Sequence, residues 1–236
     1  MSTTTAIIFG GSSGIGEAAA KKLVSTGYHV IIVGRDQNRL EQARDRIGAG
    51  VEIASVDGTD RPAVEAFFKK VGSFQHLLLS IGGKGAGLFR DVDINEIRGG
   101  MEGKFFSYIS IAQSALETLQ VGGSITFISA GSARVALPGT MGLAAINGAI
   151  ESVVPVLAKE LAPIRVNAVS PGVIDTPWWN VMPQEMKEAI FKQTSETLPV
   201  HRVGIPDDVA QAIVYLIGNT FVTGTVLEVD GGGHLG

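Results

Sequence analysis

The sequence contains no cysteine among its 236 residues, which excludes disulfide bonds, thiolate metal sites and a cysteine nucleophile. Charged residues make up only 18% of the chain without long runs, and the formal net charge is -4. This balance argues against a nucleic-acid surface or an anionic membrane partner. No basic segment precedes the first short apolar run, and no apolar stretch approaches the roughly 20 residues that span a bilayer. We therefore expect a cytoplasmic protein without nucleic-acid or membrane partners.

Short apolar runs rich in β-branched residues alternate with longer amphipathic segments along the whole chain. Such alternation is typical of a parallel sheet covered by helices on both faces. We predict strands at residues 6–9, 30–33, 51–56, 76–80, 124–129, 165–170 and 226–229. We predict helices near residues 14–26, 37–47, 61–71, 93–119, 141–161 and 206–217. Because no linker divides the chain, the pattern predicts a single α/β domain with a doubly wound, seven-stranded parallel sheet.

A glycine-rich turn follows the first predicted strand and opens the first predicted helix. Its glycines allow a tight turn and a close approach of the backbone to a pyrophosphate, and the helix N-terminus offers free N–H groups to that anion. The strand–turn–helix setting predicts a Rossmann-type dinucleotide site and makes a purely structural turn the less favoured alternative. The candidate cofactor-binding residues here are Gly10, Ser12, Ser13, Gly14, Ile15 and Gly16.

The end of the second predicted strand should meet the adenosine ribose of the cofactor. An acidic residue there favours NAD, but Gly34 occupies the position and Arg35 follows it. Arg35 can pair with a 2′-phosphate, so we predict NADP(H) in preference to NAD(H). Asp36 is adjacent, and a shift of one residue would favour NAD. The alternative for Arg35 is an ordinary surface charge at a helix start.

The segment 175–201 departs from the alternation. It contains two tryptophans, several other apolar residues and three prolines. Either it is a helical excursion that packs on its own body, or it is a lid over a ligand cleft. A lid of this composition predicts an apolar or aromatic substrate.

Several motifs, in the right order, resemble those of the short-chain dehydrogenase/reductase family. The first is the Gly-x-x-x-Gly-x-Gly spacing of the turn, and the segment 164–172 and the ending 223–232 are also close to the family pattern. The resemblance implies further cofactor contacts at Asp57, Gly58, Ser80, Gly82, Gly83, Pro171, Gly172, Ile174 and Thr176. Family members often pair one long helix between subunits. The small residues of the segment 141–161 therefore predict a homo-oligomer, a tetramer or a dimer, although packing within one chain would explain them too. Pro155 should kink that helix.

The resemblance breaks at the chemistry of the family, which uses a Ser, a Tyr-x-x-x-Lys pair and an Asn. The segment 122–149 aligns with the family pattern without gaps. In that alignment the Ser position is Ala130, the Tyr position is Leu143 and the Lys position is Asn147. The Asn position is Gly100. No shift restores the pair, because none of the three tyrosines has a lysine four residues later. The standard acid–base residues are therefore missing.

Other polar residues lie near the expected nicotinamide position. Ser129, Ser132, Arg134 and Asn147 are candidate catalytic residues; Arg134 could polarise a carbonyl, and Asn147 could bind the nicotinamide ribose. Lys84, Lys104 and His201 are also near, although for each of these groups a surface or structural role is the more common one. Two hypotheses follow. The first is an NADP(H)-dependent oxidoreductase with a non-standard proton relay, acting on a small apolar carbonyl or alcohol. The second is a non-catalytic NADPH-binding sensor or regulatory protein.

Overall fold

A computed structural model describes residues 4–235. Its seven strands form one all-parallel sheet, as the alternation predicted, and their order is β3-β2-β1-β4-β5-β6-β7. The strands are β1 (Thr5–Phe9), β2 (His29–Gly34), β3 (Val51–Ser55), β4 (Phe74–Leu79), β5 (Leu119–Ile128), β6 (Arg165–Pro171) and β7 (Val226–Val229). The order reverses between β1 and β4, and ligands of open α/β sheets bind at such a switch point, beyond the carboxyl ends of the strands.

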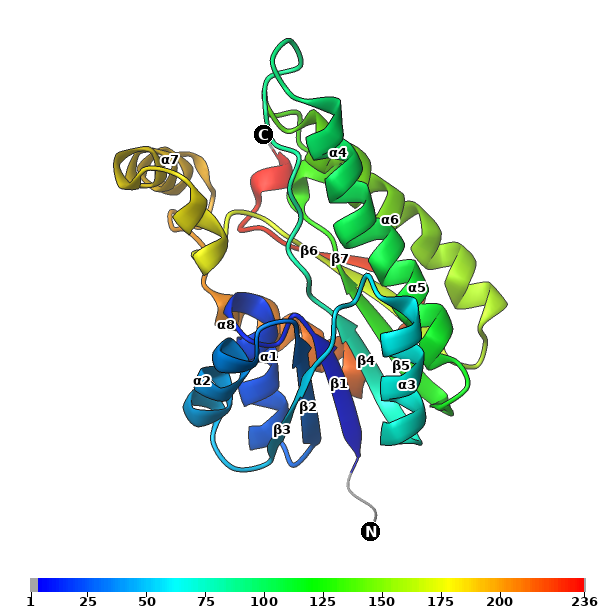
Figure 1. Cartoon of the computed structure of the whole chain (residues 1–236). Helices are drawn as coiled ribbons and strands as arrows, with labels where there is room; N and C mark the ends of the chain where they lie inside the picture. Colours follow the sequence, from blue (N-terminus) through cyan, green and yellow to red (C-terminus); the bar gives the residue numbers. More distant parts are fainter. Residues whose placement is uncertain (1–3, 236) are drawn as a thin grey trace.

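Helices cover both faces of the sheet, and each layer has its own apolar core (Figure 1). One layer contains α1 (Gly14–Ser25), α2 (Gln37–Ile47) and α8 (Pro206–Gly218). The other contains α3 (Arg61–Val71), α4 (Ile94–Gly100), the π-helix η1 (Met101–Phe106), α5 (Ser107–Ala115) and α6 (Met141–Glu160). The strands are apolar on both faces because both are buried, which accounts for their continuous rather than alternating hydrophobic pattern.

The single helix predicted over 93–119 is wrong in two respects. The six residues Met101–Phe106 are π-helical and separate α4 from α5, and Leu119 already belongs to β5. Ser107 donates its hydroxyl to the carbonyl of Glu102, five residues earlier. A π-helical turn inserts residues into an α-helix and redirects the side chains that follow, and such turns are frequent at functional sites.

Helix α6 requires a second correction. Its 20 residues are long and apolar enough to cross a membrane, although no segment of that length was expected. Ile146, Ile150 and Val154 on one side of it are buried in the core of the domain. The helix also continues through Pro155 to Glu160. Most of its remaining apolar residues are half-buried, and Met141, Ala145, Pro155 and Val156 are exposed.

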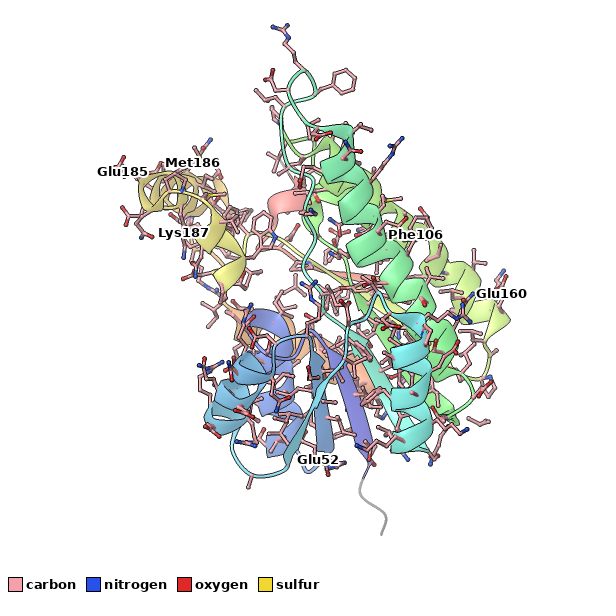
Figure 2. The ribbon with its side chains drawn as sticks, viewed as in Figure 1. Glu52, Phe106, Glu160, Glu185, Met186 and Lys187 are labelled. Atoms are coloured by element: carbon pink, nitrogen blue, oxygen red, sulfur yellow. The ribbon has the colours of Figure 1, made fainter. Side chains whose placement is uncertain are left out.

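The segment 175–201 forms an arm that extends from the body (Figure 1). It contains the short 3₁₀ helix η3 (Pro177–Val181) and the helix α7 (Gln184–Thr197), and α7 has no buried residue. Figure 2 shows Met186 and Lys187 on α7, away from the sheet. The base of the arm is closed by backbone hydrogen bonds between Asp175 and Gly204 and between Gly204 and Val173. Helix α7 therefore extends from the body, whereas both ends of the arm contact it, through Trp178 at Gly83 and through Leu198–Val200 at Gly231–Gly233.

Candidate functional site

The glycine turn lies between β1 and α1, where the strand order reverses. Gly10 has a φ of 82°, and a Cβ at Gly10 would lie 2.4 Å from the carbonyl oxygen of Ser80. A Cβ at Gly16 would lie 2.3 Å from the carbonyl oxygen of Gly10. Ser13, the N-cap of α1, makes no side-chain capping hydrogen bond, so the first N–H groups of α1 remain available to an anion. The turn thus has the shape and the donors of a pyrophosphate cradle.

Arginines lie beside this turn at the end of β2. Arg35 is exposed directly after the strand, and the guanidinium of Arg39, one helical turn later, lies 3.4 Å from the hydroxyl of Ser13. Asp36 is the N-cap of α2, and its carboxylate accepts the backbone N–H of Arg39 at 3.1 Å. That carboxylate is therefore engaged with the helix. Sequence reasoning missed Arg39, which lies in the first turn of α2 and close to the glycine turn.

The loops after β3 and β4 form the adjoining wall of the site. Asp57 accepts the backbone N–H and the hydroxyl of Thr59, and the backbone hydrogen bond lowers the pKa of Asp57. Ser80 donates its backbone N–H to Phe9, which fixes the start of the β4 loop beside the turn. Gly58 is buried, and a Cβ there would lie 2.9 Å from Ile111. The predicted adenosine contacts therefore come together along one edge of the sheet.

The segment after β6 crosses from the glycine turn to the β4 loop. A Cβ at Gly14 would lie 3.3 Å from the methyl group of Thr176. The indole N–H of Trp178 donates to the carbonyl oxygen of Gly83 at 2.9 Å, and the ring lies 3.4 Å from the Cβ position of Gly82. We call residues 176–178 the strap. The strap therefore links the glycine turn to the β4 loop and brings Gly14, Thr176, Gly82 and Gly83 into one candidate site.

The base of the strap is held by the end of the sheet. Pro171 is the last residue of β6, and Gly172 donates its backbone N–H to Val229 of β7. A Cβ at Gly172 would lie 2.8 Å from Asp230, so this turn accommodates only glycine without rearrangement. Ile174 is buried in the core.

A buried lysine lies at the centre of the site, which sequence reasoning did not predict. Lys104 of η1 is 5% exposed, and its ammonium donates to the Oδ1 of Asn147 at 2.8 Å and to the carbonyl oxygen of Ser129 at 3.4 Å. Asn147 of α6 in turn donates its Nδ2 to the hydroxyl of Ser132 at 3.1 Å. The stem of Lys104 passes 3.2 Å from the Cβ position of Gly83. Lys104 is therefore not a surface residue, whereas the alternative of a structural role agrees with its two hydrogen bonds.

Two other candidates belong to a separate ionic group. Ser129 is buried and donates its hydroxyl to the carboxylate of Glu151 at 2.7 Å. Arg134 donates to the other oxygen of Glu151 at 2.9 Å and forms a second ion pair with Glu228. Ser129 and Arg134 thus hold the end of β5 against α6 and β7, and a catalytic role for either stays a prediction. The other two candidate catalytic residues, Ser132 and Asn147, are hydrogen-bonded to each other beside Lys104.

The positions of the family chemistry can be located on these elements. Ala130 follows β5, and Leu143 lies one turn before Asn147 on α6, 3.9 Å from the Cβ position of Gly83. A Cβ at Gly100 would lie 2.3 Å from the carbonyl oxygen of Lys84 and 2.7 Å from Ile146. An asparagine at residue 100 therefore requires the loop and the helix to separate.

The other titratable groups near the site are engaged or distant. Tyr108 is buried, burial raises the pKa of its hydroxyl, and that hydroxyl donates to the backbone of Ile81 and Ile128. Lys84 is exposed and pairs with Glu96. His201 is exposed at the end of the arm, with a φ of 52°.

A mostly apolar hollow of about 490 Å³ lies beside the N-terminus of α6. Its lining includes Leu88, Phe89, Val135, Leu137 and Met141. The side chains come from the loop before α4 and from the segment between η2 (Gly131–Ala133) and α6. The ring of Phe89 is 82% exposed, so the hollow opens to solvent.

Comparison with known proteins agrees with this architecture. The family model described as enoyl-(acyl carrier protein) reductase matches residues 10–234. The chain is 32% identical to carbonyl reductase family member 4 of Xenopus laevis, with 95% of each chain covered. A small-chain dehydrogenase solved in complex with NADPH is 36% identical and superimposes with a TM-score of 0.86, covering 99% of this chain and 100% of the other.

A second solved structure is a short-chain oxidoreductase from Pseudomonas aeruginosa PAO1 that contains an atypical catalytic center. It is 25% identical to this chain with a TM-score of 0.87, and the match covers 97% of this chain and 96% of the other. Each match covers nearly the full length of both compared chains, which agrees with the family motifs found along the whole sequence. The chain therefore belongs to the short-chain dehydrogenase/reductase family of oxidoreductases.

Proposed function

We propose that this protein is an NADP(H)-dependent oxidoreductase that interconverts a small apolar carbonyl compound and its alcohol. The observation that carries the proposal is the glycine cradle, with Gly10 and Gly16 in backbone contact and the N-terminus of α1 uncapped. When bound there, NADP(H) supplies or accepts the hydride. Its pyrophosphate would be held by the N–H groups of the turn.

The preference for NADP(H) is supported by the charges at the end of β2. Arg35 and Arg39 offer two guanidinium groups to a 2′-phosphate, while the carboxylate of Asp36 caps α2. Guanidinium is well suited to phosphate because its donors are arranged as a planar fork. The relative of 36% identity was solved with NADPH, which agrees with this assignment.

An apolar substrate is supported by the surroundings of Ser132 and Leu143. The hollow lined by Leu88, Phe89 and Met141 adjoins the start of α6, and the arm carries apolar side chains. We propose that the segment 175–201 acts as a lid, hinged at the backbone pairing of Gly204 with Val173 and Asp175. Closure of such a lid would exclude water from the reacting atoms.

Within this site the protein's own residues orient the substrate. Ser132 receives a hydrogen bond from the Asn147 amide, which leaves its own hydroxyl proton free to be donated to a substrate oxygen. Leu143 provides an apolar wall at the position where the family has its tyrosine. Ser132 would thus polarise the carbonyl, and a positioned hydrogen-bond donor of this kind stabilises the charge that develops on oxygen.

We also propose that the chain functions in the cytoplasm as a homo-oligomer, a dimer or tetramer. Apolar side chains remain exposed on the layer formed by η1, α5 and α6, including Phe106 and Val156. Figure 2 shows Phe106 on the outside of that layer. Size-exclusion chromatography with light scattering tests the proposal, and a monomer at micromolar concentration would contradict it.

Titration of cofactor-free protein with NADPH and NADH, followed by tryptophan quenching and thermal stability, tests the proposed function. A ligand at 100 times its Kd should stabilise the fold by about 2.7 kcal/mol. Tight NADPH binding followed by NADPH consumption with apolar ketones, aldehydes or quinones would support the enzyme. Binding without turnover, together with a cofactor-dependent change in affinity for a protein partner, would favour the sensor. No binding of either cofactor would refute both functions.

A further inference from the structure

The candidate site contains a buried lysine, Lys104, whose burial is not compensated by an ion pair within residues 4–235. Lys104 extends from η1 beneath the β4 loop to the start of the chain segment after β5, and its ammonium has no carboxylate within salt-bridge distance among residues 4–235. Burial of an unpaired ammonium is costly, so such groups are rare in apolar cores and are common at functional sites. The nearby carboxylates of Glu151 and Glu228 pair with Arg134 instead.

We propose that Lys104 is the acid–base residue of this oxidoreductase, with Asn147 as its positioning residue. The ammonium gives a proton to the substrate oxygen during reduction, and the amine takes it back during oxidation. This inference rests on the proposed function, because it assigns the proton of that reaction.

The geometry of Asn147 supports the assignment. An extended lysine places its ammonium about 6 Å from its own Cα, and an asparagine side chain followed by one hydrogen bond ends at about the same distance. The observed hydrogen bond from Lys104 to the Oδ1 of Asn147 is 2.8 Å long. Together the two residues therefore place an ammonium about as far from the backbone of α6 as a lysine at residue 147 would place its own.

The π-helical turn explains how a residue of the neighbouring helix reaches this point. Lys104 lies within η1, and Gly83 in the facing loop has no side chain, so the lysine stem passes 3.2 Å from its Cβ position. Gly100, one turn earlier, is packed against the carbonyl oxygen of Lys84. A side chain at residue 83 would therefore crowd the stem of Lys104, and glycine there leaves that stem its place.

Among residues 4–235, the other candidate proton donors of this region are held by hydrogen bonds or ion pairs or lie away from it. The Tyr108 hydroxyl is held by two backbone carbonyls, and burial raises its pKa. His76 lies in β4 and is bonded to Ser124 on β5, within the sheet and before the carboxyl ends of both strands. Lys84 is exposed and paired with Glu96.

The surroundings of Lys104 favour a proton that is easily lost. Burial lowers the pKa of its ammonium to about 7, and the carboxylate of Glu151 on α6 opposes that shift. The ring of Tyr108 on α5 lies 5.9 Å from the ammonium and favours the charged form. An acid–base group with a pKa near the working pH has both protonation states populated, which suits catalysis in either direction.

The proton step balances with these groups. On reduction the carbonyl carbon accepts a hydride, the C=O π pair moves to oxygen, and that oxygen forms an O–H bond with a proton of Lys104. The N–H bond breaks, its electron pair remains on nitrogen, and the neutral amine regains a proton from solvent. Ser132 holds the oxygen during the transfer, and Asn147 keeps the lysine nitrogen in place.

The test compares Lys104→Met, which removes the exchangeable proton, with Lys104→Arg, which keeps a positive charge that cannot be lost. Lys84→Met is the control, because that lysine is exposed and near the same loop. The Lys104 ammonium is titrated directly by NMR in protein containing lysine labelled with ¹³C at Cε, with Lys104→Met identifying the signal. We expect the Lys104 signal to titrate near neutral pH. The midpoint of this titration should be lower in the NADP⁺ complex than in the NADPH complex, because the oxidised nicotinamide ring is positively charged.

Both Lys104 variants should bind NADPH and lose roughly 10²–10⁴-fold in hydride-transfer rate, whereas Lys84→Met should retain the rate. A Lys104 signal that titrates at the ordinary value of a lysine, or one that cofactor leaves unchanged, would overturn the inference. Wild-type rates in Lys104→Arg would overturn it too. Failure of the wild-type protein to bind either cofactor would refute the proposed function and the inference with it, whereas binding with an unaffected Lys104 refutes the inference alone.

Discussion

Replacement of Arg35 by alanine should weaken NADPH binding and leave NADH binding nearly unchanged. A hydrogen bond to a charged group contributes about 1.5–3 kcal/mol. Because Arg35 is exposed, solvent screening favours the lower end of that range. A loss of about 1.5 kcal/mol corresponds to a roughly tenfold rise in Kd. Removing Arg39 as well should raise the Kd for NADPH further, since its guanidinium lies beside Ser13 of the turn.

The assay is a fluorescence titration with each cofactor at several salt concentrations. Arg44→Ala is the matched control, because Arg44 is exposed on the last turn of the same helix. NADPH affinity should fall with rising salt more steeply in wild type than in Arg35→Ala, since screening acts on the same ion pair.

The reasoning would be refuted if Arg35→Ala weakened NADPH and NADH equally, because the side chain would then act on the shared part of the ligand. Asp36→Asn gives a second check. Asparagine retains the N-cap of α2, so NADH affinity should not change. A loss of NADH affinity in that variant would show that the carboxylate binds the ribose.

Three further predictions concern other parts of the molecule. Gly16→Ala should abolish stabilisation by NADPH, because its methyl group would collide with the Gly10 carbonyl, while Gly148→Ala, with open space around it, should bind normally. Trp178→Phe removes the hydrogen bond that holds the strap across the cleft, and stopped-flow measurement should show faster NADPH association; an unchanged rate would mean that the strap does not limit entry. His76 is buried and burial lowers its pKa to about 4 from an ordinary value near 6.5, so the unfolded state binds more protons in that window. Urea unfolding should therefore show about 3 kcal/mol of stability lost as pH falls from 6.5 to 4, and His76→Gln should remove most of that slope.

The sheet and the cofactor edge could be predicted from sequence because their signals are local. A buried parallel strand must be apolar throughout, and a turn that meets a pyrophosphate must be rich in glycine, so both leave continuous patterns in the chain. The predicted strand 30–33 lies within β2, and the predicted strand 226–229 coincides with β7. The prediction of a seven-stranded parallel sheet is confirmed, whereas the order of its strands was not predicted and comes from the structure.

The polar centre could not be predicted because it depends on which side chains from distant segments meet. Lys104 and Asn147 are 43 residues apart, and their contact depends on a π-helical turn that helical periodicity does not distinguish. One signal was present: Tyr108 and Ile111, a turn or two after Lys104, are fully buried, so the lysine falls on an apolar stripe. A charge in such a stripe is a reason to look for a partner.

The strap could not be predicted for a similar reason. Its composition indicated an apolar segment, but the contact between Trp178 and Gly83 joins loops that follow β6 and β4. The extension of α7 from the body likewise depends on the backbone pairing at Gly204, a residue with no distinctive pattern around it.

The close packing at Gly100 has a consequence for redesign of this site. Restoring serine, tyrosine and lysine at residues 130, 143 and 147 would place a second ammonium beside Lys104 in a buried space, where like charges repel strongly. Replacing Gly100 by asparagine would first require the loop at Lys84 to move. Transplanting the standard residues therefore requires compensating changes at Lys104 and in the loop at Lys84, beyond the four positions themselves.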